Sequence, residues 1–324
     1  MRPSHAVGKM RFRNTHPRPL VLCAVLCALW WPSAALGQSP ESYSIHWAPI
    51  EMWGFLRSQG IDTVVTALSP IDRERWPVVF QKARELDLKL IVALWPLPYK
   101  IDGDEVSIRA AEGFLNYLKM NPSSRERVTA LYGVDEPFWQ DCYGCGWTTP
   151  QMIRLRERIR SIIPDMKMYY DMGDIAFWEK MNRDPTSIHF FHKTWIDDAA
   201  FDYVSIYYGK DRIGKRLEES IRANRGTLNG DNALGRKLNI RLICMLNTYR
   251  SRSYNMHMPD RQELENFSRQ AITSGQIDGY GFYPWHMDLY EDDLSRHPEL
   301  WDAIGAVCKR WLCGRIDCSC GSNP

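Results

Sequence analysis

Eight short apolar or β-branched runs recur along the chain, and segments with helical periodicity separate them. The runs are Tyr43–Trp47, Asp62–Leu68, Lys89–Leu94, Val128–Val134, Lys167–Tyr170, Phe201–Tyr208, Ile240–Leu246 and Asp278–Tyr283. Near-continuous apolar runs of this length are typical of strands that are buried on both faces, as in parallel sheets. The pattern therefore predicts eight strands of one parallel sheet.

Helices are predicted between these strands, because apolar residues recur there at a spacing of three or four. Four of them have start signals at Ser69-Pro70, Thr149-Pro150, Pro259-Asp260 and His297-Pro298, where a cap residue or an early proline favours a helix start. Strand and helix in alternation predict an α/β protein, a single-domain (β/α)8 or TIM barrel over residues 38–312. A doubly wound open sheet is the alternative, but no glycine-rich turn follows any of the runs.

The N-terminus is predicted to be a secretory signal over residues 1–37. Five basic residues and no acid precede an apolar run from Leu20 to Trp31, and small residues follow it. This order is typical of a signal peptide, and Gly37 is the best cleavage point. We expect a secreted or periplasmic protein without stable membrane insertion after cleavage. An uncleaved N-terminal anchor is the alternative.

The charge balance excludes a nucleic-acid partner. Residues 1–37 contain five of the 41 basic residues and none of the 39 acidic ones. The remaining chain has a net charge of −3 and no basic stripe that would bind a phosphate backbone. Nothing in the sequence indicates an obligate assembly, so a monomer is expected.

The cysteines after residue 37 suggest disulfides, which are the default in an exported protein. Cys244 lies in an apolar run and is predicted to be a buried free thiol. Cys142 and Cys145 are predicted to form one local bridge. Cys308 and three cysteines of a short Cys-rich tail, residues 313–324, allow three pairings; those three are Cys313, Cys318 and Cys320. A zinc site in the tail is the alternative.

Candidate chemistry is expected at the carboxyl ends of the strands, where the active sites of (β/α)8 barrels lie. Reading those ends gives aromatic, carboxylate and amide side chains, a mixture that suits carbohydrate binding. The predicted substrate-binding residues are His46, Trp95, Tyr132, Tyr208, Asn247, Tyr249 and Trp285. No metal site and no cofactor is predicted.

The fourth strand runs into Asp135-Glu136-Pro137. An acid pair followed by proline at this place resembles the (β/α)8 glycoside hydrolases of the large retaining clan, which usually have Asn-Glu-Pro. The resemblance implies a glycoside hydrolase that cleaves a poly- or oligosaccharide, with Glu136 as general acid/base. Asp135 would orient the substrate or tune the acid, since two adjacent carboxyl groups do not both ionise freely.

One departure from that clan concerns the second carboxylate. The clan has its nucleophile at the end of the seventh strand, where this chain has Asn247. Glycoside hydrolysis normally uses two carboxylates, and the candidates for the second are Asp135, Asp171 and Asp174. We favour Asp171, which directly follows the fifth strand. At Tyr208 and Trp285 the chain is also similar to chitinase-like barrels. In those enzymes an N-acetyl group of the substrate replaces the nucleophile.

Two further classes of protein compete with this interpretation. A metal-dependent hydrolase would need a His-x-His pair on the first strand, which has only His46, and the pair His189 and His192 lies between elements. A non-catalytic barrel that binds a glycan or a protein is the stronger alternative. The missing carboxylate on the seventh strand is its best argument.

Overall fold

The computed structural model describes residues 42–69, 72–94, 104–133, 149–171, 203–208, 215–229, 240–252, 256–285 and 291–312. All of them belong to one compact unit, Gly37–Pro324. The expected signal segment and the cysteines of the expected tail lie outside these residues, so export and the tail remain predictions.

Eight parallel strands form a closed barrel, as the apolar runs predict. The strands are β1 (Ser42–His46), β2 (Thr63–Leu68), β3 (Lys89–Leu94), β4 (Val128–Tyr132), β5 (Met168–Asp171), β6 (Tyr203–Tyr208), β7 (Arg241–Asn247) and β9 (Gly279–Tyr283). Each strand pairs with the next one along the chain, and β9 closes the barrel by pairing with β1 from Ser42↔Gly279 to Ile45↔Phe282. Each predicted run overlaps one of these strands and differs from it by no more than two residues at either end.

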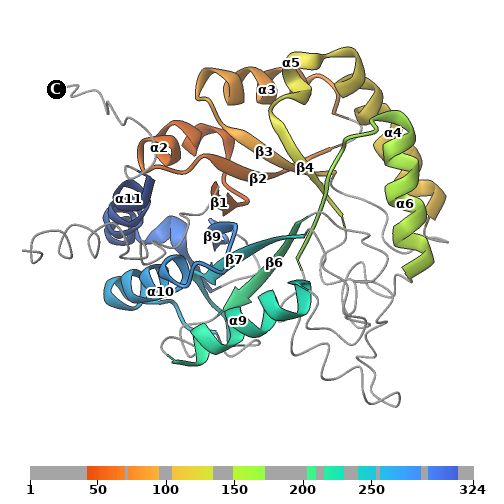
Figure 1. Cartoon of the computed structure of the whole chain (residues 1–324). Coiled ribbons are helices and arrows are strands. Elements are labelled where there is room, and N and C mark those ends of the chain that lie inside the picture. Colours follow the sequence, from red (N-terminus) through yellow and green to blue (C-terminus); the bar gives the residue numbers. More distant parts are fainter. Residues whose placement is uncertain are drawn as a thin grey trace, which may run out of the picture. The chain divides into compact units, whose positions relative to one another are not determined.

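Helices surround the strands (Figure 1), and within the described residues a helix follows every barrel strand except β5. They are η1 (Ile50–Met52), α2 (Trp53–Ser58), α3 (Arg75–Glu85), α4 (Asp104–Met120), α5 (Pro122–Arg125), α6 (Thr149–Ile162), α9 (Lys215–Asn229), α10 (Arg261–Thr273), η3 (Leu294–Arg296) and α11 (Pro298–Leu312). The order of strands and helices is that of a TIM-like α/β fold.

The start signals predict α6, α10 and α11 correctly, and the clearest case is α10. Asp260 accepts a hydrogen bond from the Glu263 amide, and the Glu263 carboxylate accepts one from the Asp260 amide. This capping box satisfies backbone donors that a helix start leaves open.

The expected helix start at Ser69-Pro70 is wrong, because α3 begins at Arg75. The amides of Arg75 and Trp76 donate to the carbonyls of Asp72 and Arg73, so a turn precedes the helix. The first buried residue of the apolar face is Trp76, whose indole nitrogen donates to the Ser69 carbonyl. Burial of Trp76, rather than the proline signal, determines where the helix begins.

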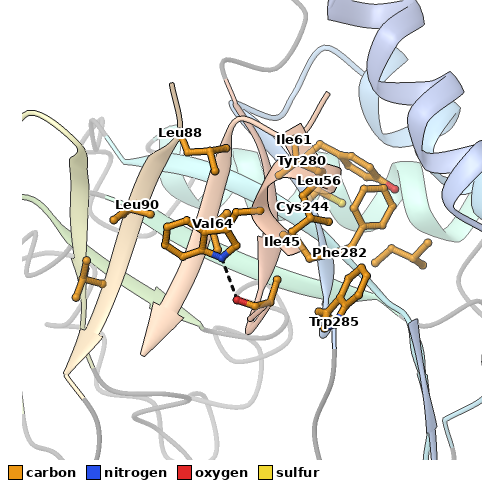
Figure 2. Close-up of a cluster of buried hydrophobic side chains, with 14 of the residues drawn as sticks. Ile45, Leu56, Ile61, Val64, Leu88, Leu90, Cys244, Tyr280, Phe282 and Trp285 are labelled. Atoms are coloured by element: carbon orange, nitrogen blue, oxygen red, sulfur yellow. Dashed lines mark hydrogen bonds between the residues drawn. The ribbon is translucent and has the colours of Figure 1, made fainter. Parts of the chain in front are cut away.

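Alternate residues of each strand face the barrel interior and the helices. Inside the barrel, Tyr132 and Tyr169 pack with small and aliphatic side chains. A larger cluster fills the space between the strands and the helices; Figure 2 shows part of it, with Trp285 near the arrowhead ends of the strands. On β5, Tyr170 belongs to this outer cluster, while its neighbour Tyr169 belongs to the interior.

A short antiparallel ribbon, separate from the barrel sheet, was not predicted. β8 (Tyr249–Arg250) pairs with β10 (Asp292–Asp293). Cys244 of β7 is fully buried, as predicted, and forms no disulfide with another described residue. Burial raises the pKa of its thiol. No helix among the described residues is long and apolar enough to cross a membrane.

Candidate functional site

Six barrel strands end on a polar or phenolic residue, and the structure describes the side chains of five of them. His46, Tyr132, Asp171, Asn247 and Tyr283 are the last residues of β1, β4, β5, β7 and β9. The carboxyl ends of parallel barrel strands lie on one face, so these side chains gather there. We call this set of five residues the mouth, and it contains four of the residues that the sequence predicts as site residues.

One member of the mouth, Asp171, is a carboxylate. Asp171 is fully buried, and its Oδ2 accepts a hydrogen bond from the phenol of Tyr132. The same oxygen lies 3.8 Å from Nδ1 of His46. A buried carboxylate is stable only when hydrogen-bond donors replace water around it, and Tyr132 is one such donor.

His46 is a fully buried member of the mouth and is uncharged at neutral pH. Desolvation by burial lowers the pKa of its imidazole to about 4, although the nearby charge of Asp171 opposes this shift. Its Nε2 shares a hydrogen bond of 3.1 Å with the phenol of Tyr169. The phenol of Tyr132 therefore orients Asp171 directly, and the phenol of Tyr169 holds the neutral imidazole of His46 beside that carboxylate.

Aromatic rings surround the imidazole of His46. The ring centroids of Trp47, Tyr132, Tyr169 and Tyr283 lie 5.3–6.5 Å from that of His46, and all four pairs are edge-on. The predicted set of site residues omits Trp47, Tyr169 and Tyr283. Strand alternation could have identified Tyr169, since it stands two residues before Asp171 and so faces the same side.

Asn247 is almost completely buried at the end of β7. Its amide nitrogen lies 3.9 Å from the sulfur of Met256. Its Oδ1 has no hydrogen-bond partner among the described residues. A buried acceptor of this kind is costly unless something satisfies it, which favours a hydrogen bond from a ligand at this position.

Tyr249 and Trp285, predicted to stack on sugars, are packed within the protein. Tyr249 is 6 % exposed, and its ring lies edge-on to Tyr283 at 6.0 Å. Trp285 is also 6 % exposed and packs on Trp301 of α11 with centroids 4.7 Å apart. Their remaining exposed area is small, so broad stacking on these two rings would require movement.

The acid pair and one stacking candidate lie outside the described residues. These are Asp135, Glu136 and Trp95. Tyr208 is the last residue of β6, but the structure describes only its backbone. Within the described part of the chain, no group of three histidine, cysteine, aspartate or glutamate residues is arranged to hold a metal ion.

Several solved glycosidase structures have a similar fold. A glucosidase from Croceicoccus marinus matches with a TM-score of 0.58 at 11 % identity, over 85 % of this chain and 69 % of that one. An endo-beta-1,4-mannanase from Thermotoga petrophila matches with a TM-score of 0.52 at 11 % identity, over 87 % and 78 %.

A third similar structure is longer than this chain. It is a beta-galacturonidase from Eisenbergiella tayi bound to galacturonate, with a TM-score of 0.56 at 9 % identity. The match covers 84 % of this chain and about half, 51 %, of that one. No family model and no curated protein matches the sequence. The likeness is therefore one of fold, shared with TIM-barrel glycoside hydrolase structures.

Proposed function

We propose that this chain is an exported glycoside hydrolase with Glu136 as general acid/base and Asp171 as the second carboxylate. Its substrate is a poly- or oligosaccharide or another glycoside, and Asp135 assists Glu136. Export rests on the N-terminal sequence, and the bridge between Cys142 and Cys145 is proposed with it. The shared fold with glycosidases supports the reaction class.

The hydrogen bond between Tyr132 and Asp171 is the observation that carries the proposal. It brings the end of β4 against a carboxylate at the end of β5. Glu136 follows Tyr132 by four residues, and four residues span at most about 14 Å. This reach permits the separation of about 5–9.5 Å between Glu136 and Asp171 that two-carboxylate hydrolysis uses and that the proposal requires.

In the proposed reaction, Glu136 donates its proton to the glycosidic oxygen as the bond to the anomeric carbon breaks. Asp171 either attacks that carbon and forms a glycosyl ester, which water then hydrolyses, or accepts a proton from the attacking water. Glu136 recovers its proton from water in the first route. Asn247 Oδ1 accepts a hydrogen bond from a sugar hydroxyl, which satisfies that buried acceptor.

The proposal is tested with Glu136→Gln and Asp171→Asn in a screen of neutral and N-acetylated glycans. The release of reducing sugar measures hydrolysis. Loss of a general acid/base typically lowers the rate about 10²- to 10⁴-fold. Each variant should therefore be at least about 10²-fold slower than the wild type. The control is Glu126→Gln, an exposed glutamate just before β4 at the opposite end of the barrel. Turnover by Glu136→Gln at the wild-type rate would exclude Glu136 as the acid.

A glycan-binding barrel without catalysis is the second candidate. It is favoured by the complete burial of Asp171 and by its hydrogen bond to Tyr132, which are also features of a structural carboxylate. Titration calorimetry with the same glycans separates the two functions. Binding without turnover by the wild-type protein would support the binding barrel over the hydrolase.

A further inference from the structure

A groove of about 590 Å³ opens beside the mouth, at the carboxyl ends of β1 and β2. We call it the tryptophan groove. Its walls come from the segment after β1, the end of β2, the start of α3 and the segment after β9. They include Trp47, Trp53, Thr66, Val79 and Trp285. The volume falls within the range of about 300–1,000 Å³ that is usual for small-molecule sites.

Trp47 borders both the tryptophan groove and the mouth. The half-buried indole of this residue lines the groove, and it also contacts Tyr132 with ring centroids 5.6 Å apart. The backbone of Trp47 has φ 61°, a left-handed conformation that is uncommon for a residue with a side chain. Its amide donates to the Val65 carbonyl at 2.9 Å. Trp47 is thereby held between the mouth and the groove.

The chemistry of the walls selects the occupant. Carbon and indole surfaces dominate, and the polar side chains on the walls are Thr66, Arg75 and Ser295. The indole nitrogen of Trp53 is already used, since it donates to the Ala48 carbonyl at 3.1 Å. A sugar ring needs several hydrogen-bond partners for its hydroxyls, and these walls supply few of them. An aromatic ring needs none and packs well against apolar walls and against the half-buried indole of Trp47.

We propose that the tryptophan groove binds an aromatic aglycone, so that the substrate is an aryl glycoside with its sugar at the mouth. The identification of the bound ring as the aglycone of a substrate rests on the proposed hydrolase function. Binding of an aromatic ring to the groove rests on the groove alone. The exposed residues Pro49 and Arg75 at the groove leave it accessible from solvent.

The binding experiment uses 4-nitrophenol as the probe and saturation-transfer NMR as the measurement. Thr66→Phe, at a half-buried wall position, fills the groove, and Thr129→Phe is the matched control at a half-buried strand position at the other end of the barrel. The wild type and the control should give a signal that Thr66→Phe loses. If circular dichroism shows that Thr66→Phe is unfolded, Arg75→Trp at an exposed wall position of the groove replaces it. A signal that survives in the folded groove variant overturns the proposal.

The kinetic experiment uses 4-nitrophenyl and methyl glycosides of the sugar that the hydrolysis screen identifies. Thr66→Phe should lower kcat/KM for the aryl glycoside at least 10-fold and leave the methyl glycoside unchanged. Comparing the variant with the wild type cancels the better leaving group of the aryl substrate. Equal losses on both substrates would overturn the assignment of the groove to the aglycone. If no sugar is hydrolysed, the hydrolase proposal fails, while 4-nitrophenol binding still decides whether the groove takes an aromatic ring.

Discussion

The phenol of Tyr132 donates its hydrogen bond to the carboxylate of Asp171, and this contact joins the last residues of β4 and β5. The register of the sheet explains why they meet. Tyr132 pairs with Tyr169 across the two strands, and Asp171 stands two residues further along the same inward face. Neighbouring strand ends in a closed barrel are staggered, so the long Tyr132 side chain reaches the carboxylate of the next strand.

Tyr132→Phe should destabilise the protein, because it removes this donor from a buried carboxylate. Hydrogen bonds to charged groups contribute about 1.5–3 kcal/mol, and we expect a loss of about 2 kcal/mol in urea unfolding. Tyr117→Phe is the control, since Tyr117 shares a hydrogen bond of 3.3 Å with the neutral hydroxyl of Ser124 away from the mouth. Equal losses in the two variants would contradict the special role of the contact with Asp171.

Acid should destabilise the protein through His46. Burial lowers the pKa of its imidazole to about 4, while the unfolded chain titrates near 6.5. Between these values the unfolded state binds more protons, so stability is present above pH 6.5 and is lost as the pH falls towards 4. The slope is about 1.4 kcal/mol per pH unit, or roughly 3 kcal/mol over the whole interval.

Urea unfolding of the wild type and of His46→Gln at a series of pH values measures this slope. The variant should be less stable at pH 7 and show a flatter profile between pH 6.5 and 4. His257→Gln, which changes an exposed histidine, is the control and should keep the wild-type slope. If the variant does not fold, NMR titration of the His46 ring in the wild type reports its pKa directly, and a value near 6.5 would refute the prediction.

Gly281→Ala should be destabilising, because β9 approaches β1 and β7 too closely for a methyl group. An added Cβ would lie 2.7 Å from Met245 Sδ and 2.8 Å from the Ser44 carbonyl oxygen. Overpacking of this kind typically costs about 1–3 kcal/mol, and the backbone carbonyl cannot move aside as a side chain can. Gly54→Ala in α2 meets nothing within 4 Å. It should leave stability unchanged or raise it by about 0.5–1 kcal/mol in the same thermal unfolding assay.

The barrel could be predicted from the sequence because local signals determine it. The eight runs have the apolar composition typical of strands buried on both faces, and this pattern does not depend on distant contacts. The same alternation explains why His46, Asp171 and Asn247 could be chosen as site residues: each ends an inward-facing row of a strand. Strand ends are thus predictable in advance of the contacts between them.

The contacts around the mouth and the start of α3 could not be predicted. Tyr169 reads as one more core tyrosine of β5, and its partner His46 lies 123 residues away in the sequence. Trp47 has a positive φ that its residue type does not signal. The start of α3 depends on burial of Trp76 rather than on the local Ser69-Pro70 signal. Each of these features follows from barrel closure and packing, which local patterns do not encode.

Asp278 should be the most sensitive ionic residue at the amino-terminal end of β9. Its Oδ2 accepts hydrogen bonds from Arg225 at 2.6 Å and from the Leu242 amide at 2.8 Å. Its Oδ1 accepts one from Arg241 at 3.2 Å. The carboxylate of Asp278 therefore attaches both the start of β7 and the helix α9 to the start of β9.

Asp278→Asn keeps the shape of the side chain but removes its charge, leaving the largely buried guanidinium of Arg225 without its anion. Breaking a fully buried pair costs about 3–5 kcal/mol, and the partial exposure of Asp278 reduces this to about 2 kcal/mol. Asp165→Asn is the control, because its ion pair with Arg125 is largely exposed and should contribute less than about 1 kcal/mol. Urea unfolding of both variants compares the two sites. A loss for Asp278→Asn no larger than that for Asp165→Asn would mean that the carboxylate does not tie α9 and β7 to β9.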